Sequence, residues 1–101
     1  MRILIEAIIP NETGNAYAKD GSLGTRIEKV LADLKPEAAY FLERDGKRCA
    51  IMVVHANDSS DLPRMAEPFF LQFNAEAHFH ICMGAEDLAK ADVPSLGKKW
   101  G

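Results

Sequence analysis

Residues 75–83 read Ala-Glu-Ala-His-Phe-His-Ile-Cys-Met and alternate strictly between apolar and polar side chains. A period of two is typical of a β-strand, because successive side chains of a strand point to opposite faces of the sheet. One face of this strand is therefore apolar. The other face carries Glu76, His78, His80 and Cys82, so two imidazoles, a carboxylate and a thiol are predicted to lie on one side of one sheet.

The rest of the chain predicts three more strands and two main helices. Apolar and alternating runs predict strands over residues 2–9, 38–44, 47–55 and 75–83. Apolar positions at helical spacing predict helices over 22–34 and 61–73, with a short helix over 85–91. Residues 10–21 are rich in Gly, Asn and Asp and are predicted to form a long loop. Residues 91–101 form a weakly specified tail.

The second main helix, over residues 61–73, is predicted to bury an apolar stripe. This stripe includes Leu62, and the cluster Phe69, Phe70 and Phe73 is predicted to pack in the core. Pro68 lies within this helix and is expected to kink it, because proline removes an internal hydrogen bond.

The order β-α-β-β-α-β predicts one α+β domain over residues 1–101, with the plan of a ferredoxin-like sandwich. In this plan a four-stranded antiparallel sheet carries its helices on one face. Right-handed crossovers place the first and third strands in the middle of the sheet, with the fourth beside the first.

The face of the sheet without helices is expected to be apolar. Leu4, Ile8, Met52 and Val54 are assigned to it. An apolar face of this extent is rarely left in water. Two such faces packed across a two-fold axis would bury it, so the expected partner is a second copy of the chain.

Composition excludes several classes of protein. The chain has 101 residues, of which 48% are hydrophobic and 27% charged, and this balance is typical of a folded globular domain. A net charge of −3 argues against a nucleic-acid surface, and no segment approaches the roughly 20 apolar residues that span a membrane. Because no secretion signal is recognised, Cys49 and Cys82 are expected to be reduced thiols in a cytoplasmic protein.

Six short segments carry a resemblance to a known superfamily. They are Ile9-Pro10-Asn11-Glu12, Gly14-Asn15, Lys19 to Leu23, Leu34 to Phe41, Ala66 to Phe70 and Glu86-Asp87-Leu88. On these segments the chain, up to about residue 91, resembles the dimeric α+β barrel superfamily. The likeness is greatest to a bacterial subgroup of similar length, related to muconolactone isomerase and the antibiotic-biosynthesis monooxygenases. The resemblance implies the fold and a homodimer, but no family catalytic motif is matched.

His78, His80 and Glu6 are the candidate catalytic residues. Glu6 lies on the non-helical face of the first strand, which is predicted to neighbour the fourth, so a histidine and this carboxylate could act as an acid–base pair. The two histidines could instead bind a metal ion, with Glu6, Glu76 or Cys82 as the third ligand. A third interpretation is that these groups only hydrogen-bond to one another.

Four further residues are predicted to contact a ligand. Asn15 and Lys19 come from the long loop, and Met52 and Cys82 come from strands; Tyr17 is expected on the loop's surface. The leading hypothesis is a homodimer that binds a small, partly apolar molecule on the non-helical face, as a cofactor-free isomerase or monooxygenase. The alternatives are a non-catalytic binding or structural dimer and a metal-binding protein.

Overall fold

A computed structural model describes residues 1–101 and contains one four-stranded antiparallel sheet with five helices. The strands are β1 (Arg2–Ile9), β2 (Ala38–Arg44), β3 (Lys47–His55) and β4 (Glu76–Cys82). Their order in the sheet is β2-β3-β1-β4, so β1 and β3 are central and β4 lies beside β1. This small α+β structure is compatible with a ferredoxin-like fold.

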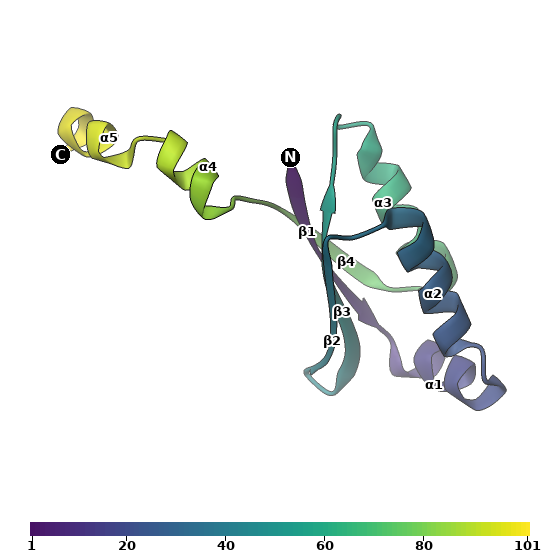
Figure 1. Cartoon of the computed structure of the whole chain (residues 1–101). Coiled ribbons are helices and arrows are strands. Elements are labelled where there is room, and N and C mark those ends of the chain that lie inside the picture. Colours follow the sequence, from purple (N-terminus) through teal and green to yellow (C-terminus); the bar gives the residue numbers. More distant parts are fainter.

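The helices α2 (Leu23–Leu34) and α3 (Asp61–Phe73) cover one face of the sheet (Figure 1). The helix predicted over 22–34 is present as α2, and it buries Val30 and Leu34 in the core. In α3, Phe69 and Phe73 are buried, whereas Leu62 and Phe70 are exposed, which corrects their assignment to the core. The helix continues through Pro68 to Phe73.

Residues 11–20 form a helix, α1 (Asn11–Asp20), and not the predicted loop. Pro10 precedes the first turn with φ −57°, and Gly21 ends the helix with φ +81°, a left-handed conformation that glycine adopts without strain. Tyr17 holds α1 against the core, because its ring packs edge-on against Phe73 at 6.0 Å and its hydroxyl donates to the Gln72 carbonyl. Tyr17 is therefore half-buried and not a surface loop residue.

The register of β3 corrects the predicted open face of the sheet. Met52 pairs with Ile5 and Val54 pairs with Ile3, and all four side chains are buried beneath the helices. The open face instead carries Ile51 and Val53 of the same strand. Both faces of β3 are apolar, so its hydrophobic pattern does not specify which face lies inward.

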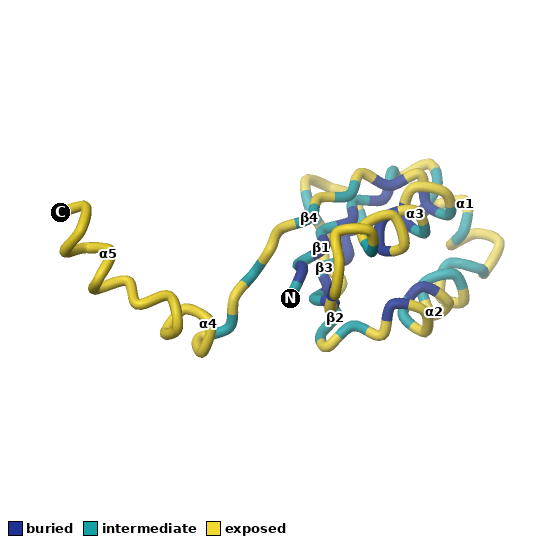
Figure 2. Tube along the Cα trace, turned by 90° about the horizontal axis from the view of Figure 1, so that it is seen from above, coloured by how far each residue is buried: buried dark blue, intermediate teal, exposed yellow.

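The last two helices project from the rest of the molecule. The predicted short helix is present as α4 (Ala85–Lys90), and the tail forms another helix, α5 (Val93–Trp100). Figure 2 shows that both helices are exposed along their whole length and lie apart from the sheet. The radius of gyration is 16.7 Å, against about 13 Å for a compact domain of this length. None of the five helices is long and apolar enough to cross a membrane.

Candidate functional site

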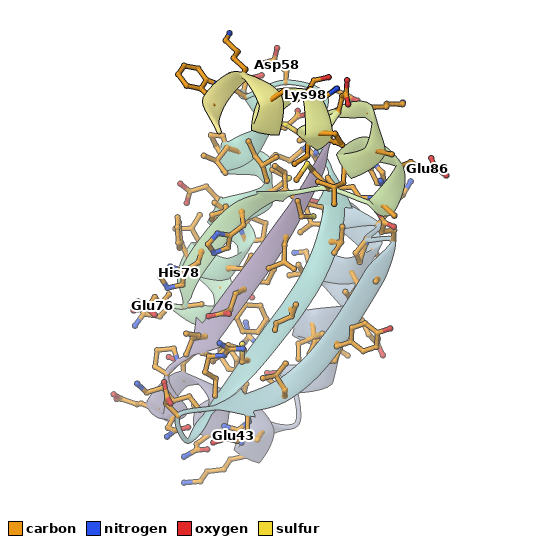
Figure 3. The ribbon with its side chains drawn as sticks, turned by 90° about the vertical axis from the view of Figure 1, so that its left-hand side faces the viewer. Glu43, Asp58, Glu76, His78, Glu86 and Lys98 are labelled. Carbon is orange, nitrogen blue, oxygen red and sulfur yellow. The ribbon has the colours of Figure 1, made fainter.

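The polar residues of β4 lie on the open face, as the alternation predicts. Antiparallel pairing sets Glu6 of β1 opposite His78, Leu4 opposite His80 and Arg2 opposite Cys82. Figure 3 looks onto this face and shows His78 and Glu76 next to each other on β4, at the margin of the sheet. The sequence therefore correctly predicts which residues share this face.

The three candidate catalytic residues do not converge. His78 Nε2 lies 2.9 Å from Glu76 Oε2, in a pair that is open to solvent. The carboxylate of Glu6 instead pairs with Arg44, whose Nη1 lies 3.2 Å from Glu6 Oε2, and His80 makes no side-chain hydrogen bond. No group of three His, Cys, Asp or Glu side chains is close enough to hold a metal ion. Within one chain, the predicted site is therefore not assembled.

The ion pair of Glu6 and Arg44 adjoins a buried thiol. Cys49 is 2% exposed. Burial raises the pKa of its thiol, the negative charge of Glu6 raises it further, and Arg44 partly offsets both effects. The thiol is therefore protonated near neutral pH and is a poor nucleophile. Arg44 Nε is buried without a hydrogen-bond partner.

A second polar cluster lies at the opposite end of the same face. Glu37 Oε1 accepts a hydrogen bond from Arg2 Nε at 2.6 Å and lies 3.0 Å from His55 Nε2. The hydrogen bond from Arg2 lowers the pKa of Glu37 and raises the pKa of Arg2. Glu37 comes 35 residues after Arg2, so no local pattern of the sequence could have predicted this cluster.

The structure contains an apolar cavity on the helical side of the sheet. It has a volume of about 200 Å³ and lies between α2, α3 and the strands β1, β2 and β3. Eleven of its twelve lining residues are hydrophobic. Six of them are Leu23, Ile27, Val30, Ala50, Met52 and Phe73. Such a cavity suits a small molecule with an apolar body.

Arg48 is the only charged residue that lines this cavity. Its Nη1 donates to Asn15 Oδ1 of α1 at 3.0 Å, and no carboxylate lies within ion-pair distance of it. Gly14 makes room for the guanidinium, because a Cβ atom at this position would lie 2.7 Å from Arg48 Nη1. The surface of the cavity is therefore almost entirely apolar, and Arg48, the one charged residue at its boundary, forms no ion pair.

The four predicted ligand contacts lie in different places. Met52 lines the cavity on the helical side, and Asn15 lies beside it through its hydrogen bond to Arg48. Lys19 is exposed near the end of α1, and Cys82 lies on the open face as a free thiol. Arg48 was missed because a lone arginine on a predicted strand carries no signal of a site.

In comparisons with known proteins, no family model matches this chain and no curated protein matches it. Folds of this kind host many unrelated functions, so the fold by itself assigns none. The function is therefore inferred from the geometry of the chain itself.

Proposed function

We propose that this protein is a homodimer of the dimeric α+β barrel type. In the cavity beneath α2 it binds a small molecule that has an apolar body and one carboxylate group. The observation that carries the proposal is that Arg48 is the one charged residue at the boundary of an otherwise apolar cavity. The ligand site is thus assigned to the helical side of the sheet, and the open face is assigned to the second copy.

The chemistry of Arg48 favours a carboxylate. A guanidinium presents two parallel N–H donors that match the two oxygens of a carboxylate. Arg48 has one neutral acceptor in Asn15 and forms no ion pair, since the carboxylate of Glu43, which lies opposite it on β2, accepts from the Gly46 N–H. A hydrogen bond to a charged group contributes about 1.5–3 kcal/mol. The apolar wall supplies the rest of the affinity through burial of the ligand's body.

The open face supports the homodimer. Its apolar positions include Leu4 and Ile8 of β1 and Ile51 and Val53 of β3, and all four are only partly buried in the single chain. Glu6 lies between Leu4 and Ile8 on this face. Tyr40 of β2 lies in the same row as Ile51 and is exposed. An isologous contact between two such faces removes this apolar surface from water.

Binding without chemistry is favoured over an isomerase or monooxygenase. The cavity is lined by apolar side chains and Arg48, and none of these groups is a general base at neutral pH. His78, His80 and Glu6 lie on the other face of the sheet. His78 pairs with Glu76 and Glu6 pairs with Arg44, so the three side chains do not act on one another.

The experiment compares phenylacetate with 2-phenylethanol, a neutral molecule of similar size, by isothermal titration calorimetry on the full chain. We expect phenylacetate to bind more tightly, and Arg48→Met to weaken phenylacetate by about tenfold to a hundredfold. The same substitution should leave the affinity for 2-phenylethanol nearly unchanged. Lys47→Met is the matched control, since it removes a neighbouring positive charge that does not line the cavity. Equal binding of phenylacetate to parent and Arg48→Met would overturn the proposal.

A further inference from the structure

The C-terminal arm, residues 84–101, leaves the sheet at the end of β4 and extends on the side of the open face. Figure 1 shows the sheet with its helices on one side and the arm on the other, and Figure 3, viewed from the open face, shows the arm in front of the sheet's upper end. The arm's one ion pair with the rest of the chain joins Arg2 Nη1 to Asp87 at 3.6 Å. The arm therefore occupies the space on the side where a second copy would pack.

The arm carries an apolar stripe that nothing in its own chain covers. Val93, Leu96 and Trp100 follow one another at spacings of three and four residues, which places them on one face of α5. They are 51%, 48% and 77% exposed, and Leu88 of α4 is 51% exposed. Helices of this length are not stable alone in water, so the stripe needs a surface to pack against.

We propose that each arm packs its apolar stripe against the body of the second copy, so that the two chains of the dimer exchange arms. This inference rests on the proposed homodimer. Two uncovered apolar surfaces of one chain, the open face and the stripe, face the same side and cannot cover each other, because the arm points away from its own sheet. A second copy on the open face covers both surfaces, and a two-fold axis makes the exchange reciprocal.

The arm provides its own probe, since Trp100 is the only tryptophan of the chain. The experiment follows the emission maximum of Trp100 and its quenching by acrylamide in the full chain, from nanomolar to micromolar concentration, together with the mass from light scattering. As the protein concentration rises, we expect the emission maximum of Trp100 to move to shorter wavelength and its quenching by acrylamide to weaken. Both changes should occur over the concentration range in which the mass doubles.

Two variants isolate the stripe. Leu96→Gln should raise the dissociation constant of the dimer by about tenfold or more, because each dimer buries two copies of Leu96, one from each chain. Lys98→Gln introduces the same side chain on the opposite side of α5 and should change the constant by no more than about twofold.

The outcomes separate the arm from the dimer. A chain that stays monomeric at all concentrations overturns both the arm exchange and the proposed homodimer. A dimer whose Trp100 is as accessible as a free indole overturns the exchange alone, as does a Leu96→Gln variant that dimerises like the parent. Protection of Trp100 in a monomer also overturns the exchange, since the arm would then fold back on its own chain.

Discussion

Gly14 sets the position of Arg48, so Gly14→Ala tests the proposed site without touching the cavity wall. The added Cβ would lie 2.7 Å from Arg48 Nη1 and 3.2 Å from its Cδ. These distances are too short for a stable contact, so the arginine side chain must move. Its hydrogen bond to Asn15, 3.0 Å in the parent, should then break.

The expected effect on stability is small because two terms oppose each other. Alanine within a helix is more favourable than glycine by about 1 kcal/mol, and Gly14 lies inside α1. Loss of the hydrogen bond between Arg48 and Asn15 costs about 0.5–1.5 kcal/mol. The free energy of unfolding from urea denaturation should therefore change by less than about 1 kcal/mol.

The expected effect on binding is large. The affinity for phenylacetate, measured by calorimetry, should fall by about tenfold or more, because the guanidinium is displaced from its position beside Asn15. Gly24→Ala is the matched control: it makes the same change in α2, where a Cβ meets nothing within 4 Å. It should leave the affinity for phenylacetate unchanged. A Gly14→Ala variant that binds phenylacetate as tightly as the parent would refute the role given to Arg48.

Two further predictions concern stability. Phe69→Ala should lower the free energy of unfolding, measured by urea denaturation, by about 3–5 kcal/mol, because Phe69 is 3% exposed. Phe70→Ala should lower it clearly less, and Pro68→Ala should leave the fold intact. A larger loss of stability for Phe70→Ala or Pro68→Ala than for Phe69→Ala would show that the buried face of α3 is misassigned. The pKa of Glu37 is lowered in the folded state, above all by its hydrogen bond with Arg2, so its contribution is present above the ordinary glutamate pKa of about 4.3 and is lost as pH falls through the lower folded value. The free energy of unfolding, measured by urea denaturation at a series of pH values, should therefore fall less for Glu37→Gln than for the parent below about pH 4.3. Free energies that fall equally with pH in both proteins would contradict this linkage.

The sequence predicts a strand reliably where its two faces differ in polarity. In β4 every outward position from Glu76 to Cys82 is polar or a thiol, so the alternation gives both the strand and its orientation. In β3 both faces are apolar, and the orientation becomes clear only from the pairing of Met52 with Ile5. Strand pairing of this kind depends on the whole sheet, and it is not encoded within one strand.

Helix α1 could not be predicted from its composition. Its Gly, Asn and Asp content is unfavourable in a helix, and the contacts that stabilise it come from distant parts of the chain. Tyr17 packs on Phe73, and its ring also lies 3.8 Å from the guanidinium carbon of Arg26 in α2. Tertiary packing therefore overrides a weak local preference.

The candidate site was only partly predictable, for the same reason. The sequence predicts Met52 and Asn15 as ligand contacts. It does not predict Arg48, which lines the cavity together with Met52 and donates a hydrogen bond to Asn15. Its importance depends on the space left by Gly14 and on the lack of an ion pair with Arg48, and both are properties of the folded chain.

The most direct test of the proposed site is an NMR titration of the methyl groups with phenylacetate. We predict that the shifts concentrate on methyl groups that line the cavity, such as those of Ile9, Ile27 and Val30. The chemical shifts of methyl groups on the open face, such as those of Leu4, Ile8 and Ile51, should not change at the same concentration of phenylacetate. Shifts confined to the open face, or no shifts at saturating phenylacetate, would contradict a carboxylate site beneath α2.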